Sequence, residues 1–151
     1  MNRSAQSPLR PELDPTLDFL RLLWSIENCL QSTSKRMASS LGITGPQRLA
    51  LRVVSQFPGI SPKEVADLLR LHPSTITGVL QRLVDKGLLS RERHATDGRR
   101  AHLRAKPTAA RFTRGNRNTV EAAVARALRR MPKSSVQHAR DVLTAIIEEL
   151  G

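Results

Sequence analysis

The chain has 151 residues, a single cysteine and only 3% aromatic residues. Its length suits one structural domain, and an internal disulfide is excluded. Lysine and arginine outnumber aspartate and glutamate by 25 to 13, which gives a net charge of +12. Residues 82–140 hold sixteen of the basic residues and only four acidic ones. This excess predicts a polyanionic partner.

Nucleic acid is a better candidate for that partner than a membrane. No segment combines a basic face with the bulky aromatic and aliphatic face of an interfacial helix. The sequence also has no run of eighteen apolar residues, and residues 1–15 lack the apolar stretch of a secretory signal. We therefore expect a cytoplasmic protein with no membrane partner.

The first part of the chain predicts an arm followed by helices. Residues 1–12 are rich in proline and small polar residues, which predicts an extended or disordered arm. Residues 13–43 form the first dimerisation helix region, with an apolar stripe of Leu13, Leu17, Leu20, Leu23, Trp24 and Leu30. Thr44 and Gln47 then have the spacing of a capping box, so a second helix begins there.

Residues 61–87 predict two short helices joined by a tight turn. Ser61 and Glu64 form a capping box, with Pro62 at the first helical position. Pro73 begins the second helix, and Gly87 ends it in a position that suits a left-handed residue. The apolar stripe of this second helix consists of Ile76, Val79, Leu80, Leu83 and Val84.

The opposite face of the second helix carries short polar side chains instead of the usual Lys and Glu. It consists of Ser74, Gly78, Gln81 and Asp85, flanked by Thr75, Thr77 and Arg82. Hydroxyl, amide and guanidinium groups can hydrogen-bond to phosphates and base edges without filling a groove. Most polar helix faces are simply solvated, but the scarcity of Glu favours a face that enters a DNA groove.

Two strands around a basic turn follow this helix. Residues 88–93 and 100–106 are the strand candidates, and the second alternates polar and apolar residues. Asp97 and Gly98 predict the turn between them, and Arg99 and Arg100 follow directly. Arginines at such a hairpin tip suit a minor groove or a phosphate backbone. Asp97 is close enough to orient the guanidinium of Arg99 and so to stabilise the wing.

The order of these elements resembles the DNA-binding lobe of the multiple-antibiotic-resistance regulator (MarR) family. The run PSTITGVLQRLVDKGLLSR, the later Asp97-Gly98-Arg99-Arg100 and the earlier Thr44-Gly45-Pro46-Gln47 carry the resemblance. It implies a mainly α fold: a winged helix-turn-helix lobe over residues 44–106, a β wing of two to three strands, and terminal dimerisation helices that include residues 107–151. The DNA-binding residues are then expected to be Ser61, Lys63, Ser74, Thr75, Thr77, Gly78, Gln81, Arg82, Arg99 and Arg100.

The function predicted is sequence-specific binding of double-stranded DNA by a homodimeric transcriptional regulator. We expect a repressor relieved by a small-molecule effector. The alternative from another class is a basic nucleoid- or RNA-associated protein that binds without sequence choice. The hydroxyls and amide between Ser74 and Arg82 argue against it, because a non-specific binder needs only charge.

Enzymatic activity, a cofactor and a metal site are not expected. The histidines are His72, His94, His102 and His138, and none of them pairs with Cys, Asp or Glu at the spacing of metal ligands. The sequence also contains no recognisable phosphate-binding loop and no recognisable Ser-His-Asp set.

Cys29 leaves a further alternative open. The resemblance places it in the first helix, as in the family's peroxide-sensing branch. A thiol-based redox-sensing repressor is therefore an alternative hypothesis for the function. That branch uses tyrosines and this chain has none, and cysteine is commonly buried, so we expect Cys29 to be packed. The resemblance also implies a small aromatic or amphipathic anion as effector, with Phe19 and Trp24 as the candidate pocket.

The C-terminal part is predicted to be helical. Gly115, Asn116 and Asn118 are poor helix formers, so the helix in residues 108–131 should kink or start late. Ser134 and Gln137 have the spacing of a further capping box ahead of the last apolar stripe.

Overall fold

The structure is a computed structural model that describes residues 12–93 and 101–151. Its elements are α1 (Pro15–Leu41), α2 (Gly45–Gln56), α3 (Pro62–Leu69), α4 (Pro73–Asp85), β1 (Leu89–Arg93), β2 (Ala101–Ala105), η1 (Pro107–Ala109), α5 (Ala110–Thr113), α6 (Val120–Leu128) and α7 (Lys133–Leu150). The predicted mainly helical fold with a small β wing is confirmed. Within the described ranges, no helix combines the length and hydrophobicity needed to cross a bilayer.

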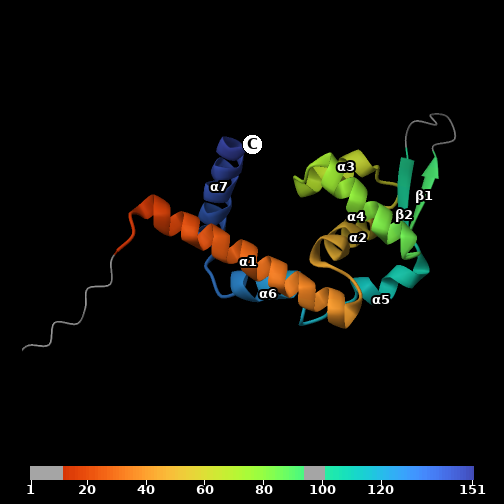
Figure 1. The fold of residues 1–151 in the computed structure, drawn as a ribbon, viewed down its shortest axis with the longest axis horizontal. Coiled ribbons are helices and arrows are strands. Elements are labelled where there is room, and N and C mark those ends of the chain that lie inside the picture. The colour runs from red at the N-terminus through yellow and green to blue at the C-terminus, as the bar shows by residue number, and fades with distance from the viewer. Residues whose placement is uncertain (1–11, 94–100) are drawn as a thin grey trace, which may run out of the picture.

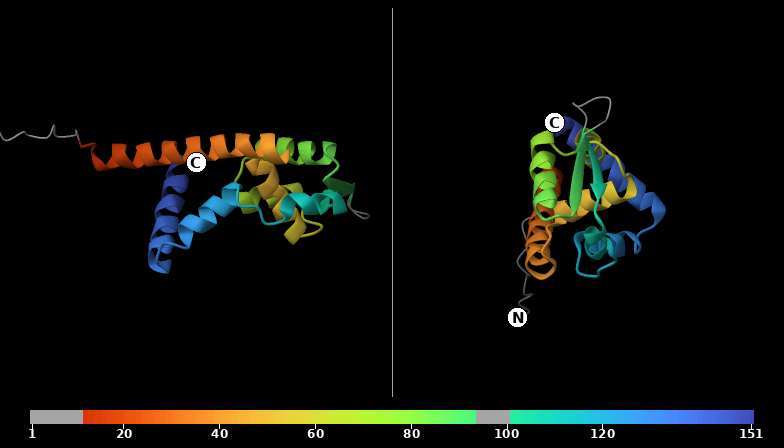
Figure 2. Two further views of the ribbon diagram at one scale, coloured as in Figure 1. Left: turned by 90° about the horizontal axis from the view of Figure 1, so that it is seen from below. Right: turned by 90° about the vertical axis from the view of Figure 1, so that its right-hand side faces the viewer.

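The elements gather into a lobe at one end and projecting helices at the other (Figures 1 and 2). The lobe contains α2, α3, α4, α5 and the two strands, whereas α7 and the N-terminal half of α1 extend away from it. The hydrophobic core lies in the lobe. Its buried side chains come from α2, α3, α4 and both strands, and include Leu51, Val65, Ile76, Leu83, Leu89 and Leu103.

Local capping interactions define where the lobe's helices begin. Both predicted capping boxes are present: Thr44 with Gln47 at α2, and Ser61 with Glu64 at α3. At α3, the Glu64 amide donates to the Ser61 hydroxyl at 3.2 Å, and the Ser61 amide donates to the Glu64 carboxylate at 2.8 Å. Each box satisfies backbone donors that the first helical turn cannot pair.

Helix α4 ends as predicted before a left-handed glycine. Gly87 has φ +69°, and the amide of Leu88 donates to the carbonyl of Leu83 at 2.9 Å. This closes the helix and turns the chain directly into β1. Strands β1 and β2 pair antiparallel, from Leu89 opposite Ala105 to Arg93 opposite Ala101.

The other edge of β2 is also hydrogen-bonded. The amide of Gly59 donates to the carbonyl of Leu103 at 2.8 Å, and the amide of Leu103 donates to Ile60 at 2.9 Å. The segment between α2 and α3 therefore occupies the third position in the wing, although only β1 and β2 are strands in the described residues.

The C-terminal segment confirms one expectation and corrects another. Helix α6 begins only at Val120, after the short α5 and the run that contains Gly115, Asn116 and Asn118. The predicted capping box of Ser134 and Gln137 is wrong. Helix α7 begins at Lys133 after Pro132, without a side-chain cap, and Gln137 instead donates to Asp141 at 2.8 Å. Pro132 has the extended backbone of an N-cap residue, with φ −57° and ψ 146°, so the helix starts directly after it and leaves Ser134 inside its first turn.

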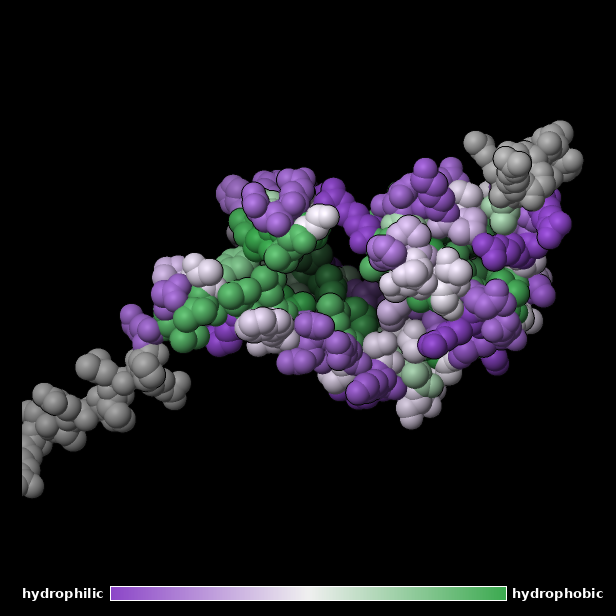
Figure 3. All heavy atoms as spheres, turned by 45° about the horizontal axis from the view of Figure 1, so that its top comes forward, coloured by the Kyte–Doolittle hydropathy of each residue, from purple (hydrophilic) through white to green (hydrophobic). Residues whose placement is uncertain are grey.

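The projecting helices leave a broad apolar surface uncovered. Helix α7 contains no buried residue, and Leu17, Trp24 and Ile147 are each more than half exposed. Figure 3 shows hydrophobic side chains gathered over α7 and the N-terminal half of α1. A contiguous apolar surface of this kind indicates contact with another protein surface.

Candidate nucleic-acid interface

Helix α4 is held by one apolar face, which directs its polar face outward. Ile76, Leu80 and Leu83 are almost fully buried, and α4 packs against α2 and α3. Three anchors spaced along one face fix the rotation of the helix about its axis. The structure therefore places the predicted binding residues of α4 on the surface; all of them are exposed, namely Ser74, Thr75, Thr77, Gly78, Gln81 and Arg82.

Some of these side chains already have intramolecular partners. The Gln81 amide nitrogen donates to Asp85 Oδ1 at 2.8 Å, and the Thr77 hydroxyl donates to the carbonyl of Pro73 at 2.8 Å. Gln81 is thus oriented along α4 before any ligand arrives. Among the described residues, the side chains of Thr75 and Arg82 make no hydrogen bond or ion pair, which leaves their donors available.

Gly78 keeps the middle of this face low. An added Cβ at Gly78 would meet nothing within 4 Å, so the helix backbone is open to close approach by a ligand. A glycine inside a helix costs about 1 kcal/mol relative to alanine, so its presence here suits a site that a partner approaches closely.

The turn between α3 and α4 contains two residues that the sequence alone did not indicate. Arg70 is exposed and has φ +49°, a left-handed conformation that is unfavourable for a side chain with a Cβ. His72 caps α4, and its Nδ1 accepts from the Ser74 amide at 3.3 Å. This conformation costs free energy, and it lies at a residue that carries a positive charge just before the exposed helix.

The predicted residues at the start of α3 have different roles. Lys63 is exposed and has no polar contact among the described residues. The hydroxyl of Ser61 is occupied in the capping box, where it also donates to Glu64 Oε2 at 2.7 Å. Ser61 therefore has a clear structural role, whereas Lys63 is free to contact a ligand.

The tip of the wing lies outside the described residues. This applies to Asp97, Arg99 and Arg100, whose predicted roles stay predictions. The strands leading to the tip carry the exposed Arg91 and Arg93. Positive charge therefore extends along β1 toward the wing.

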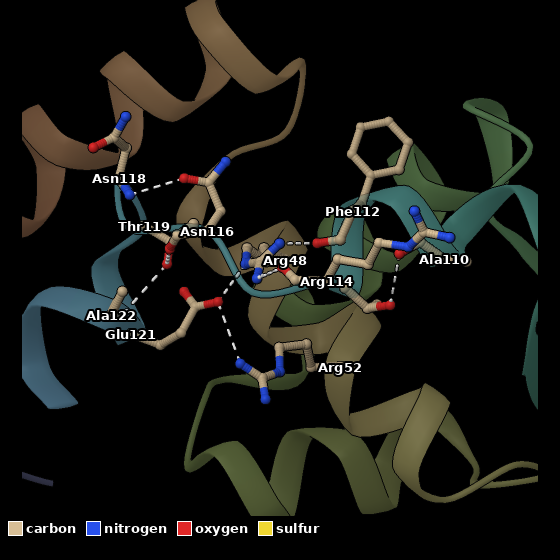
Figure 4. A network of polar contacts seen from close by, with 11 residues as sticks. Arg48, Arg52, Ala110, Phe112, Arg114, Asn116, Asn118, Thr119, Glu121 and Ala122 are labelled. Carbon is tan, nitrogen blue, oxygen red and sulfur yellow. Dashed lines mark hydrogen bonds and ion pairs between the residues drawn. The ribbon is translucent and has the colours of Figure 1, made fainter.

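A buried arginine connects the lobe to the C-terminal segment (Figure 4). Arg48 on α2 is only 2% exposed, and its guanidinium donates to Glu121 and to the carbonyls of Phe112 and Arg114, the last at 2.7 Å. Arg52 reaches the same Glu121 carboxylate at 3.4 Å. Five guanidinium donors in a rigid plane suit this convergence of a carboxylate and two carbonyls.

The same network lowers the pKa of Glu121. Burial of the carboxyl group raises its pKa, but the hydrogen bond and positive charge of Arg48 and a backbone hydrogen bond outweigh that effect. Glu121 therefore stays ionised at neutral pH. Sequence reasoning missed Arg48; its signal is a charged residue three positions before Leu51, on the buried face of α2.

A second missed connection involves the end of α4. The Lys86 ammonium donates to the carbonyl of Gly42, at the end of α1. Since Gly42 terminates α1 in a left-handed conformation, this contact ties the base of the exposed helix to the helix that leaves the lobe.

Three residues of α1 with predicted buried or pocket roles, Cys29, Phe19 and Trp24, are exposed. The expectation that Cys29 is packed is wrong for the single chain, because Cys29 is exposed on the uncovered part of α1. Phe19 and Trp24 are also exposed, and neither lines the two cavities found near the other end of α1. Within the described ranges, no cluster of three or more His, Cys, Asp or Glu could hold a metal ion.

Comparison with known proteins agrees with this architecture. Residues 41–100 match the model of the MarR family. Over 78 residues the chain is 33% identical to the HTH-type transcriptional repressor Rv2887 of Mycobacterium tuberculosis, covering 52% of this chain and 56% of that protein. The repressor Mb2911 of Mycobacterium bovis matches equally well. The match thus spans about half the length of these curated relatives.

Solved structures share the fold across nearly the whole chain. The PcaV transcriptional regulator of Streptomyces coelicolor, solved with its natural ligand, has a TM-score of 0.74 and 22% identity, covering 94% of this chain and all of PcaV. The MepR–DNA complex of S. aureus has a TM-score of 0.72 and 16% identity, covering 91% of this chain and 99% of MepR. The fold and the outward-facing α4 define a winged helix-turn-helix protein. Its residues 41–100 are similar to the MarR family.

Proposed function

We propose that this protein is a transcriptional regulator that binds double-stranded DNA sequence-specifically through α4. The observation that carries the proposal is the exposed face of α4, where Thr75, Gln81 and Arg82 surround the low surface at Gly78. A helix with such a face fits the major groove, in which all four base pairs present different donor and acceptor patterns. The DNA complex of MepR, which has the same fold, supports this choice.

The active form that we propose is a homodimer. The uncovered apolar surface of α1 and α7 is the natural contact between two copies, because burial of such helices supplies the main driving force of obligate association. Two copies would present two α4 helices to successive half-sites on one duplex. The terminal segments 13–43 and 107–151 then act as dimerisation helices.

We infer repression as the sign of regulation and a small molecule as the signal. The repressors Rv2887 and Mb2911 support repression, and the ligand complex of PcaV supports an effector. For an aromatic or amphipathic anion, Phe19 and Trp24 are the proposed apolar contacts on α1. We propose that the protein acts on promoters in the cytoplasm of a prokaryote. The proposed function includes no enzymatic reaction.

Footprinting on the DNA upstream of its own gene tests the proposal. We expect a protected segment with two related half-sites, and retention of that duplex in a gel shift at a salt concentration that releases a scrambled duplex. Equal retention of both duplexes at every salt concentration would instead identify a basic protein that binds without sequence choice.

A further inference from the structure

A groove between α1 and α6 gathers positive charge away from α4. Its volume is about 580 Å³, and it is lined by Thr33, Arg36, Ser39 and Ser40 of α1 and by Arg117, Asn118, Thr119, Ala123 and Arg126. Helix α6 packs against α1, whereas α4 packs against α2, α3 and β1. The groove is therefore not part of the surface that α4 presents to DNA.

The three arginines of the groove have no counter-charge. No Asp or Glu lines it, and none of the ion pairs among the described residues involves Arg36, Arg117 or Arg126. Three like charges around one concave surface repel each other and attract an anion. Such an arrangement is unfavourable in the absence of a ligand and becomes favourable when an anion binds.

Hydrogen bonds hold the groove in shape but leave donors unused. Arg126 Nη1 donates to the carbonyl of Arg117 at 2.9 Å, and Arg36 Nη2 donates to the Thr33 hydroxyl at 2.8 Å. The guanidinium of Arg117 makes no polar contact among the described residues. Since each guanidinium has five N–H donors, most of those in the groove remain available.

We propose that this groove binds a small multivalent oxyanion, a compound that carries two or more phosphate or carboxylate groups. Guanidinium groups bind both kinds of oxyanion through paired, charge-assisted hydrogen bonds. The hydroxyl of Ser39 lines the same groove and can add a weaker hydrogen bond, whereas the hydroxyl of Ser40 already donates to the carbonyl of Arg36 at 2.8 Å. The site is distinct from Phe19 and Trp24, which do not line it.

Calorimetric titration of the full chain tests the proposal, with inorganic pyrophosphate and citrate as probes at constant ionic strength. We expect saturable binding of one probe per chain. If pyrophosphate binds and citrate does not, the ligand is of the phosphate type; the reverse result identifies a polycarboxylate. Absence of saturable binding by both probes would overturn the proposal.

Matched variants separate the groove from general attraction to a basic protein. Arg36→Ala and Arg117→Ala each remove one groove charge and should weaken binding about tenfold or more, the loss expected for a charge-assisted hydrogen bond. Arg129→Ala and Arg130→Ala remove the same charge from exposed positions outside the groove and should leave the affinity nearly unchanged.

Equal weakening by all four variants, or unchanged affinity in Arg36→Ala or Arg117→Ala, would overturn the site. Thermal unfolding of each variant shows that it is folded, and among the described residues the side chains of Arg36 and Arg117 make no hydrogen bond or ion pair with another helix that the substitution would remove. The titration contains no DNA. Its failure would therefore leave the proposed function of α4 untouched.

Discussion

The guanidinium of Arg48 on α2 is paired with the carboxylate of Glu121 in the first turn of α6, 73 residues further along the chain. The same guanidinium also donates to the carbonyls of Phe112 and Arg114. One buried side chain thus joins the lobe that presents α4 to the segment that leads into α6 and α7.

Removal of Arg48 should strongly destabilise the protein. Arg48→Met fills similar space but leaves two carbonyls without their donor and Glu121 with only the more exposed pair to Arg52, so we expect a loss of about 3 kcal/mol in the free energy of unfolding. Chemical denaturation at one fixed protein concentration measures it. Arg52→Ala is the control; its pair with Glu121 is half exposed and should cost at most about 1 kcal/mol. Similar losses in the two variants would contradict the central role of Arg48.

The lowered pKa of Glu121 should make stability depend on pH. Its pKa in the folded chain lies below the ordinary value of a glutamate, about 4.3 in the unfolded chain. The ionised form therefore contributes stability that is fully present above that unfolded value and is lost as pH falls through the folded value. We expect the unfolding free energy of Glu121→Gln to fall less steeply than that of the wild type below about pH 5.

The control for this pH dependence is Glu92→Gln. Glu92 forms an exposed pair with Arg104 at 3.4 Å on the wing, so its removal should leave the acid slope close to that of the wild type. Denaturation curves at several pH values compare the three proteins. A wild-type slope in Glu121→Gln would show that another carboxylate determines the acid sensitivity.

Gln81 should read sequence. If its amide pairs with a base edge, Gln81→Ala costs about 1–3 kcal/mol on the operator and little on a scrambled duplex. Gln137→Ala is a matched control, because Gln137 on α7 makes the same contact with Asp141, at 2.8 Å, that Gln81 makes with Asp85. Binding isotherms on both duplexes decide it. Equal weakening on operator and scrambled DNA would favour a protein that binds without sequence choice.

Arg99 should contribute affinity without sequence choice. It follows Asp97 and Gly98, the predicted turn of the wing, where an arginine is expected to contact phosphate or the minor groove. Arg99→Ala should weaken operator and scrambled duplexes together and reduce the salt slope by about one unit. Titrations at two salt concentrations measure both effects. A loss confined to the operator would show that Arg99 reads bases.

The apolar surface of α7 should be required for dimers. Leu143→Glu with Ile147→Glu places two charges on that surface and should shift the chain to monomers in light scattering, whereas deletion from Ser134 onward should leave an aggregating or unfolded chain. Leu68→Glu is the control, because Leu68 is similarly exposed but lies on α3. A stable dimer of the double variant would place the interface elsewhere.

Cys29→Ser should leave the response to organic peroxide unchanged. Among the described residues nothing polar contacts the Cys29 thiol, and the chain contains no tyrosine to report its oxidation. Gel shifts of wild type and variant with increasing peroxide compare the two. Because Cys29 is exposed, the opposite result has a clear meaning: release of DNA by the wild type alone would establish a thiol-based sensor.

Local patterns in the sequence were sufficient for the order and type of the elements. Apolar periodicity with the capping boxes at Thr44 and Ser61 identified α2 and α3, and the left-handed Gly87 marked the end of α4. These signals depend on interactions within a few residues, so they can be recognised in the sequence without knowledge of the tertiary fold. The same reasoning failed at Ser134, where the preceding Pro132 changed the start of α7.

The polar face of α4 was also readable from the sequence, because helical periodicity alone separates it from the buried stripe of Ile76, Leu80 and Leu83. Only the tertiary structure decided the long-range contacts. The pairing of Arg48 with Glu121 and the meeting of Arg36 with Arg117 and Arg126 in one groove join segments more than seventy residues apart. No local pattern encodes such contacts; they arise from how α6 packs against α1 and α2, which the burial of the whole chain determines.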